Sequence, residues 1–380
     1  MGAGAAGTAG TAVVVGAGVG GLATAIGLRR AGWEVTVLER RAAPERYGTA
    51  FAVHPTAQAA LDRLGRGLGE ALRERAVPYR DARIRRPDGR VLAALPLERI
   101  ERKAGRPELL ISRPYLIDAL LAALDRLGGT RIAYGQAYEA GDAWGADLLV
   151  GADGINSAVR AARFGRGSGP RELGTDAWIG IADFETGVHG ETWGDGRFFG
   201  MTPVEPGRTN WYAALPGAAT AEDVRAAFAG WHDPIPRVLA DTDPRTWIRY
   251  PVRHLHPALP AFTRTDGYGP GGARGPGGAG DPACPVALVG DAAHAMTPNL
   301  GQGACTAILD AEALTRAVTA RGTAGLPAAL RAYEGERRRS AQRVAFGSRT
   351  LHRFVTLRRP ALRDALVGLL PGGGGPATSM

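Results

Sequence analysis

The stretch that most constrains the fold is residues 12–40, which reads AVVVGAGVGGLATAIGLRRAGWEVTVLER. A β-branched run ends at Gly16, a segment with apolar residues at helical spacing continues to Gly32, and an alternating strand ends at Glu39. The pattern predicts a strand, a glycine turn, a helix and a second strand within about 30 residues, which is the βαβ unit of dinucleotide-binding folds.

The residues of this unit have separate predicted roles. Gly16 permits the tight turn, Gly18 lets the backbone approach a pyrophosphate, and Gly21 lets the helix pack closely on the strand. The N–H groups at the helix N-terminus favour phosphate binding. Glu39 suits a ribose hydroxyl and disfavours a 2′-phosphate. These features predict dinucleotide binding, but the motif alone does not choose between FAD and NAD.

The composition argues against several other classes of protein. The 380-residue chain carries a net charge of +9, but its positive charge is scattered arginine, with Lys103 the single lysine. We interpret the excess as coding bias rather than a nucleic-acid or acidic-lipid surface. The sequence contains no apolar run of about 18 residues that would predict a membrane span. Cys284 and Cys305 fit neither a disulfide framework nor a metal site, so we expect a cytoplasmic protein.

The order of elements predicts an α/β fold whose nucleotide-binding unit is split by insertions. Residues 171–260 show the period of two that is typical of a β-rich layer. The expected parts are a nucleotide-binding unit in three pieces (11–80, 101–170 and 284–326), a hairpin at 81–100, a β-sheet substrate domain at 171–280 with a Gly/Pro-rich loop at 267–283, and C-terminal helices at 327–370.

Three segments far apart in the sequence each follow a predicted strand. They are GAGVGG at 16–21, GADGINSAVR at 151–160 and GDAAHAMTPNLGQG at 290–303. The carboxyl ends of strands in a doubly wound sheet meet at the ligand crevice, so we expect the three to converge. Asp291 would accept hydrogen bonds from a polyol, and the helix after 298–303 would direct N–H groups at an electron-rich ring edge.

Together these motifs resemble those of the class A flavoprotein monooxygenases, the family of para-hydroxybenzoate hydroxylase, salicylate hydroxylase and FAD-dependent urate hydroxylase. The chain carries GxGxxG with Glu39, then Asp153-Gly154, then Gly290-Asp291 followed by PxxGQG. The resemblance spans about residues 11–345. It implies a Rossmann-like FAD-binding domain of the para-hydroxybenzoate hydroxylase type, an inserted β-sheet substrate domain and C-terminal helices. The length is similar to that of the short urate, hydroxynicotinate and salicylate hydroxylase branch.

The resemblance also implies roles for individual residues. It places Gly20 at the pyrophosphate, Glu39 at the adenosine ribose and Arg40 beside the adenosine. Further FAD contacts are implied for Ala52, Arg113, Asp153, Asp291, Gly301, Gln302, Gly303, Ala304 and Cys305. For Arg113 and Asp153, a surface salt bridge and a helix cap are the respective alternatives, and for Cys305 the alternative is a small packing residue.

The chemistry implied by the resemblance is oxygen insertion. NADH or NADPH reduces FAD, O₂ adds at the flavin C4a, and the hydroperoxyflavin delivers one oxygen atom to an aromatic or heteroaromatic small molecule. A flavin epoxidase or Baeyer–Villiger oxygenase acting on a polyketide or terpenoid is the alternative enzyme. A non-catalytic FAD- or ligand-binding protein is the alternative outside enzymes. No metal site is expected, and the protein is expected to be a monomer or a homodimer.

The substrate pocket is less constrained by the sequence. The β-rich layer should roof it, so Trp178, Trp193, Phe199 and Trp211 are candidates to face an aromatic ring, with sheet core as the alternative for each. Pro298 is a further candidate substrate contact, and His54 and Tyr212 are the candidate catalytic residues.

Two departures from the family pattern are visible in the sequence. The stretch 131–147 is short and predicts a missing hairpin on the adenosine side. Thr56 stands where the family usually has asparagine.

Overall fold

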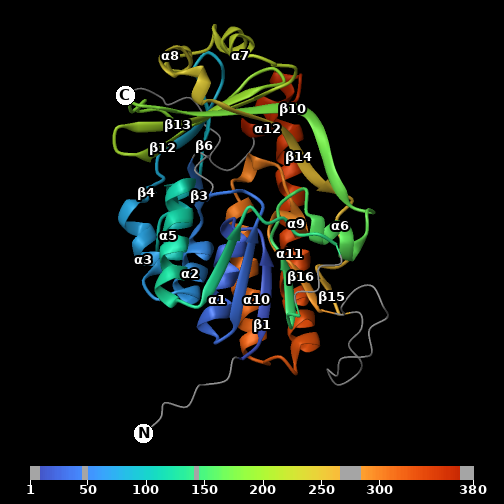
Figure 1. The fold of residues 1–380 in the computed structure, drawn as a ribbon. Helices are drawn as coiled ribbons and strands as arrows, with labels where there is room; N and C mark the ends of the chain where they lie inside the picture. Colours follow the sequence, from blue (N-terminus) through green and yellow to red (C-terminus); the bar gives the residue numbers. More distant parts are fainter. Residues whose placement is uncertain (1–8, 45–49, 141–144, 266–283, 369–380) are drawn as a thin grey trace.

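A computed structural model describes residues 9–44, 50–140, 145–265 and 284–368 of the chain. The predicted Gly/Pro-rich loop at 267–283 lies outside the described residues. The α/β fold class predicted from the sequence is confirmed, because helices surround two large sheets (Figure 1). In the part of the chain that the structure covers, no helix combines the length and hydrophobicity that crossing a membrane would take.

The lower layer in Figure 1 is a six-stranded sheet with the order β15-β16-β9-β1-β2-β8. Its strands are β1 (Thr11–Val15), β2 (Glu34–Glu39), β8 (Thr130–Tyr134), β9 (Leu148–Gly151), β15 (Thr263–Arg264) and β16 (Val286–Leu288). All neighbours pair in parallel except the edge strand β15. The central strand β1 is almost entirely buried, which explains its continuous apolar sequence.

Helices cover this sheet, and several of them begin after the carboxyl ends of its strands. They are α1 (Val19–Arg30), α5 (Arg113–Leu127), α6 (Ala158–Phe164), α9 (Asp291–His294) and α10 (Gly303–Thr319). Helix α1 packs between α5 and α10, and its buried face includes Leu22, Ile26 and Leu28. The glycine turn that begins α1 is thereby fixed against the sheet core.

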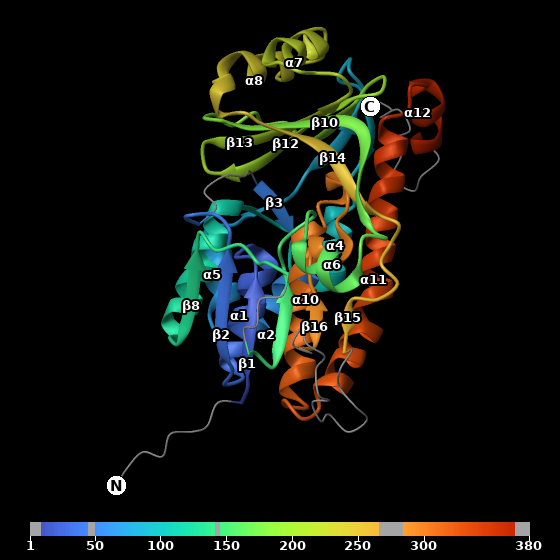
Figure 2. The same cartoon turned by 45° about the vertical axis from the view of Figure 1, so that its right-hand side comes forward.

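The upper layer is a seven-stranded sheet with the order β14-β10-β13-β12-β11-β5-β6. Its strands are β5 (Ala82–Arg85), β6 (Val91–Ala94), β10 (Gly169–Ala182), β11 (His189–Trp193), β12 (Phe198–Glu205), β13 (Arg208–Leu215) and β14 (Ile248–His256). The hairpin β5–β6 therefore joins a sheet built mostly from residues far along the chain. Figures 1 and 2 show α7 (Ala221–Phe228) and α8 (Ile235–Asp241) on the outer face of this sheet.

Smaller elements link the two layers. A three-stranded sheet of β3 (Ala50–Val53), β7 (Leu109–Ser112) and β4 (Val77–Pro78) lies beneath β12 and contacts it. The long helix α11 (Leu326–Val355) runs along both layers in Figure 2. The other elements are α2 (Pro55–Leu64), α3 (Leu68–Arg75), α4 (Leu97–Ala104), α12 (Pro360–Gly368) and two short 3₁₀ turns, η1 (Pro244–Thr246) and η2 (Pro298–Leu300).

One predicted helix is shorter than expected. The sequence suggests a helix over 67–80, but α3 ends at Arg75 and the chain continues as β4. Pro78 explains the difference, because a proline disfavours the helical conformation at the residue before it and has no backbone N–H to donate within a helix.

Candidate cofactor and substrate site

The glycine turn has the geometry that the sequence predicts. Gly16 has a φ of +107°, and a Cβ there would lie 2.4 Å from the Ala152 carbonyl oxygen. A Cβ on Gly21 would lie 1.9 Å from the Gly16 carbonyl oxygen. A Cβ on Gly18 would meet no protein atom within 4 Å. Gly16 and Gly21 are therefore required by the fold itself, whereas Gly18 leaves open space in which a ligand can approach the protein backbone.

Glu39 closes one side of this turn. It is 6% exposed, and its Oε2 and Oε1 accept hydrogen bonds from the backbone N–H groups of Ala17 and Arg41, each at 2.9 Å. A carboxylate oxygen accepts more than one hydrogen bond, so a ribose hydroxyl can still bind here. Arg40, the next residue, is exposed at the end of β2. Gly20 faces α10, where an added Cβ would lie 3.3 Å from the Ala307 Cβ.

Asp153 serves as a helix cap with one oxygen and leaves the other unused. Its Oδ2 accepts hydrogen bonds from the N–H groups of Ala158 and Val159 at the start of α6. Its Oδ1 is buried and has no hydrogen-bond partner among the residues that the structure describes. The two roles considered for Asp153 are therefore compatible, and Oδ1 is an orphaned acceptor beside the glycine turn.

Arg160 is a residue of this region for which the sequence analysis predicts no role. Its side chain is 3% exposed and donates to the carbonyl oxygens of Ala292 and Ile155. It thus ties the segment after β9 to the segment after β16. Its position in the motif at 151–160 was the available signal, but an arginine on a predicted helix start is usually solvent-exposed.

Asp291 begins α9, which contacts β14 of the upper sheet. Its side chain is open to solvent, yet enough protein surrounds it that desolvation raises the pKa of its carboxyl above the ordinary value. The charges of His294, Arg113 and Arg160 oppose that rise. The Arg113 charge also acts on Tyr250 of β14, whose pKa burial raises. The fold therefore brings Asp291 and Arg113, far apart in sequence, to one cleft beneath the upper sheet.

The N-terminus of α10 forms another wall. Gln302 is its N-cap, Gly303 and Ala304 begin its first turn, and Gly301 has a φ of +61°. The N–H groups of a first helical turn have no acceptor within the helix and can bind an electron-rich ring edge. Residues 301–304 are all partly accessible, as a ligand-binding turn requires.

Cys305 joins this turn to β3. Its thiol donates to the Ala52 carbonyl oxygen at 3.2 Å and accepts from the His54 N–H at 3.3 Å. Burial raises the pKa of the Cys305 thiol to about 12, so it is a packing and linking group rather than a nucleophile. His54 caps α2, with Thr56 contacting its Nδ1, and desolvation lowers the pKa of its imidazole.

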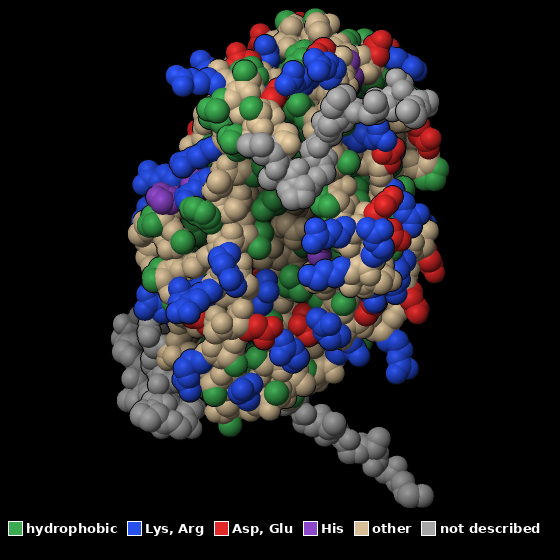
Figure 3. Space-filling model, turned by 180° about the vertical axis from the view of Figure 1, so that it is seen from behind, with side chains coloured by type: hydrophobic (Ala, Val, Ile, Leu, Met, Phe, Trp, Pro, Cys, Tyr) green, Lys and Arg blue, Asp and Glu red, His purple; other side chains and the backbone are tan. Residues whose placement is uncertain are grey.

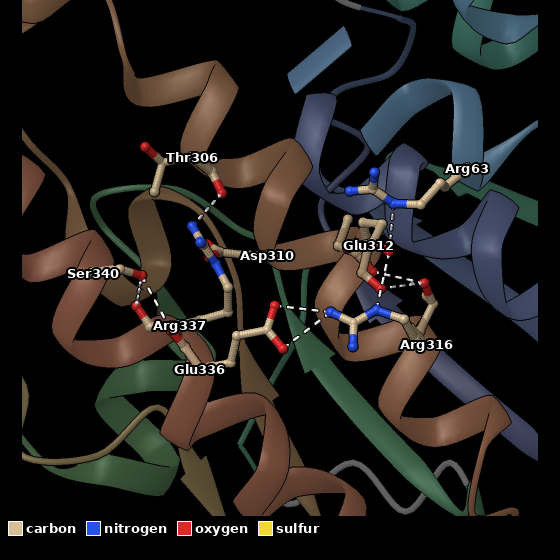
Figure 4. Close-up of polar contacts among 10 residues, drawn as sticks. Arg63, Thr306, Asp310, Glu312, Arg316, Glu336, Arg337 and Ser340 are labelled. Carbon is tan, nitrogen blue, oxygen red and sulfur yellow. Dashed lines mark hydrogen bonds and ion pairs between the residues drawn. The ribbon is translucent and has the colours of Figure 1, made fainter. Parts of the chain in front are cut away.

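A buried ionic network supports α10 behind the site (Figure 4). The Asp310 carboxylate accepts from the Gly290 N–H at 3.0 Å and from Arg337 Nε at 2.8 Å, and it also contacts His294. Burial opposes ionisation, but His294 and Arg337 hold the pKa of Asp310 below its ordinary value. Two residues along α10, Glu312 pairs with Arg63 and Arg316, whose side chains are half-exposed. The network fixes the Gly290–Asp291 turn relative to α10.

Three of the predicted substrate residues do not reach the cleft. Trp178, Phe199 and Trp211 point to the outer face of the upper sheet and pack against α7 and α8. Phe199 stacks on Trp211 with ring centroids 5.6 Å apart. The structure corrects their expected position. The physical reason is that successive strand residues face opposite sides, and the sequence does not indicate which side the helices cover.

The opposite face of the same strands carries Tyr212 and Trp193. Both donate to Glu191: Tyr212 Oη to Oε1 at 3.1 Å and Trp193 Nε1 to Oε2 at 2.6 Å. Trp193 is 4% exposed and packs against Phe354 of α11. Sequence reasoning missed Glu191. The available signal was an acid at an inward-facing position of the strand, two residues before Trp193. Pro298, the remaining candidate, is exposed in η2.

The residues present fit a bound FAD. The open space at Gly18, the orphaned Asp153 Oδ1, the accessible Asp291 and the first turn of α10 all border the junction of the two layers. Figure 3, a view from behind, shows a hollow at mid-height with basic side chains around it. The arrangement suits a dinucleotide whose phosphates lie at α1 and whose ring lies at α10.

Comparisons with known proteins agree with this geometry. The chain matches the family model described as FAD binding domain over residues 10–143 and 284–348. It is 32% identical over 363 residues to the aurachin C monooxygenase/isomerase of Stigmatella aurantiaca, covering 89% of this chain and 88% of that protein. It is 30% identical over 358 residues to the FAD-dependent urate hydroxylase of Klebsiella pneumoniae, covering 86% and 85%. The crystal structure of Klebsiella pneumoniae HpxO with FAD and uric acid matches with a TM-score of 0.76 and 26% identity, covering 94% and 91%.

Proposed function

This chain belongs to the FAD binding domain family, and we propose that it uses FAD, NAD(P)H and O₂ to hydroxylate an aromatic or heteroaromatic small molecule. It is an FAD-dependent monooxygenase, like the relatives that it covers over most of their length. When bound, FAD supplies the redox chemistry that activates O₂ with electrons taken from the nicotinamide.

One observation carries the proposal: the segments at 16–21, 151–160 and 290–303 converge on one cleft. Asp153 Oδ1 and the Asp291 carboxylate offer acceptors to hydroxyl groups of the cofactor. The first turn of α10 offers N–H donors and the positive end of a helix dipole, which stabilise negative charge on a ring. The upper sheet lies over the cleft and would limit the access of water to the place where the substrate would lie.

The location and assembly of the enzyme are also part of the proposal. Cys284 and Cys305 are both free thiols, which supports a reducing cytoplasm. A small-molecule substrate requires no partner chain at the cleft, so we propose a monomer or a homodimer. Sedimentation of the purified flavoprotein over a range of concentrations tests the assembly, and a higher oligomer would contradict it.

The test combines flavin binding with turnover. We expect the purified protein to bind FAD and to oxidise NADH or NADPH faster in the presence of one member of a panel of phenols and heteroaromatics. The product should gain one oxygen atom, measured by mass. Failure to bind FAD, or FAD binding without stimulated oxidation by any aromatic compound, would overturn the proposal.

A matched pair of glycine variants tests the cradle. Gly18 and Gly167 both lack protein neighbours within 4 Å of an added Cβ, so Gly18→Ala and Gly167→Ala should leave the apoprotein equally stable. Only Gly18→Ala places a methyl group where the pyrophosphate would approach. We expect it to weaken FAD binding by about tenfold or more, equivalent to about 1.4 kcal/mol. Equal FAD affinity of the two variants would argue against a phosphate site at α1.

A further inference from the structure

The side chain of Glu191 is half-buried on the inner face of the upper sheet. Glu191 of β11 pairs with Gly200 of β12, and Gly200 pairs with Tyr212 of β13, so the three are lateral neighbours on one face. A Cβ on Gly200 would lie 2.1 Å from Tyr212 Cζ, which means that the tyrosine ring lies across the glycine to reach the carboxyl. The glycine thus makes the Tyr212–Glu191 hydrogen bond possible.

The partners of the Glu191 carboxyl differ from those of three buried acids of this fold. Asp310, Glu312 and Asp364 each pair with one or more arginines. Within the described residues, the hydrogen bonds that Glu191 receives come from Trp193 Nε1 and Tyr212 Oη, and no arginine pairs with it. Burial accordingly raises the pKa of Glu191, while these two hydrogen bonds oppose the rise. A carboxyl group kept in such surroundings without a cation is costly to the fold.

A series of contacts connects Glu191 to the elements of the proposed flavin site. Glu191 and Tyr212 are both partly accessible, so they border space that protein atoms do not fill. Glu191 is within electrostatic reach of Tyr79, which follows β4 and whose N–H donates to the Glu108 carbonyl oxygen beside β7. Strand β7 pairs with β3, which carries Ala52 and is joined to α10 by Cys305.

The remaining hydrogen-bonding capacity of Glu191 is mainly that of an acceptor. A carboxylate has about four acceptor positions, and the bonds from Trp193 and Tyr212 occupy two of them. The two donors come from its own strand and from β13, and they fix the orientation of the carboxyl plane. A ligand lying against this face therefore meets an oriented acceptor beside aromatic rings.

We propose that Glu191 is a specificity-determining residue, which accepts a hydrogen bond from a ring N–H or a phenolic O–H of a substrate that is uncharged at that end. This inference rests on the proposed function and narrows it from aromatic compounds in general to donors of this kind. Two consequences follow. Methylation of the donor atom removes the hydrogen bond and adds bulk against a fixed side chain. A substrate carboxylate at the same position would be repelled by the ionised form of Glu191, since the described residues place no arginine against Glu191 to neutralise it.

The test measures discrimination within pairs of compounds. The oxidised FAD-loaded protein is titrated with indole against 1-methylindole, 2-pyridone against 1-methyl-2-pyridone, and phenol against anisole, and binding is followed by the change in the flavin absorption spectrum. Stimulation of NAD(P)H oxidation is measured with the same pairs. We expect the protein to favour the donor over its methylated analogue by about tenfold or more in at least one pair, because hydrogen bonds to charged or buried carboxyls are strong.

Variants assign that discrimination to Glu191. Glu191→Gln should reduce the preference to about threefold or less, because the amide turns an N–H₂ group toward the ligand in place of an acceptor. Glu172→Gln, an exposed acid on β10 of the same sheet, is the matched control and should keep the wild-type ratio. If Glu191→Gln does not fold, Glu191→Met removes the buried carboxyl without adding a polar group and should lose the preference in the same way.

The outcomes separate this inference from the function on which it rests. If the wild-type protein turns over panel compounds and Glu191→Gln keeps the wild-type ratio, Glu191 is structural and the inference is wrong while the proposed function stands. A wild-type protein that does not distinguish donors from methylated analogues overturns it in the same way. If the FAD-loaded protein oxidises NAD(P)H with none of the aromatic compounds, the proposed function itself fails.

Discussion

The two faces of the upper sheet are formed by the same strands, and both carry aromatic residues, but the two faces have different surroundings. On the outer face, Phe199 and Trp211 are fully buried against α7 and α8 in an aromatic core. On the inner face, one residue along each strand, Gly200 and Tyr212 border a partly open space and support Glu191. Because successive residues of a strand point to opposite faces, a residue that packs in the outer core is followed directly by one on the inner face.

The difference shows how one sheet supports both stability and a site. The outer face buries aromatic rings against α7 and α8, so it contributes stability, although the indole N–H groups of Trp178 and Trp211 have no hydrogen-bond partner among the described residues. The inner face contains a carboxyl without an arginine, which costs stability and supplies an oriented acceptor. Substitutions on the outer face should therefore change unfolding, and those on the inner face should change ligand binding.

The largest effect is expected from Phe199→Ala. Phe199 is fully buried between Trp211 and Phe228, with ring centroids at 5.6 Å and 5.3 Å, so truncation leaves a cavity in the outer core. We expect a loss of about 3–5 kcal/mol in the free energy of unfolding, measured by urea denaturation. Ligand affinity of the folded fraction should stay within about twofold of wild type. A large loss of ligand affinity with little loss of stability would reverse the assignment of the two faces.

A pair of glycine substitutions sharpens the comparison. A Cβ on Gly180 would lie 2.7 Å from the Trp211 ring on the outer face, and a Cβ on Gly200 would lie 2.1 Å from the Tyr212 ring on the inner face. Gly180→Ala and Gly200→Ala should each destabilise the protein by about 1–3 kcal/mol through overpacking. Only Gly200→Ala should also weaken ligand binding, because it displaces the tyrosine that orients Glu191.

The two glycine variants are measured side by side, by urea denaturation and by flavin-monitored ligand titration. Equal ligand affinities in Gly180→Ala and Gly200→Ala, at similar losses of stability, would contradict a separate role for the inner face.

The sequence predicts the cofactor side of the protein better than the substrate side. Gly16 and Gly21 are required by backbone contacts that no other residue permits, so a local motif is sufficient to predict the turn. The upper sheet gives no such signal. Trp211 and Tyr212 are adjacent aromatic residues, and only the placement of α7 and α8 determines which one faces the cleft. Glu191 depends on partners from two strands, and Arg160 on carbonyl groups from a distant segment.

A smaller effect is expected when one hydrogen bond is removed from each face. Tyr212→Phe removes the donor to Glu191 Oε1, and Thr192→Val removes the contact of Thr192 Oγ1 with His232 Nε2 at 2.9 Å. Each bond contributes about 0.5–1.5 kcal/mol. We expect Tyr212→Phe to weaken binding of a donor ligand by about two- to tenfold in flavin-monitored titrations. Thr192→Val should lower only the free energy of unfolding. A matching loss of ligand affinity in Thr192→Val would contradict the separate roles of the two faces.

The smallest effect concerns pH. Burial raises the pKa of Glu191 above its ordinary value of 4.5, and the hydrogen bonds from Trp193 and Tyr212 oppose that rise. Tyr79 is a further titratable group that lies within electrostatic reach of Glu191. Between the ordinary and the raised pKa, the native state holds a proton that the unfolded chain has released. The free energy of unfolding therefore falls as pH rises through that window.

Glu191→Gln removes this proton linkage, because an amide does not titrate. The Tm of the variant relative to wild type should therefore rise as the pH is increased from 4.5 through that window, measured by calorimetry with Glu172→Gln as the exposed control. Below the window both proteins carry a neutral side chain at this position, so the relative Tm there reports packing alone. A relative Tm that does not change across the range would mean that the Glu191 carboxyl is solvated in the folded protein. The inner face would then be as open to water as the protein surface, and the contrast with the outer face would rest on shape alone.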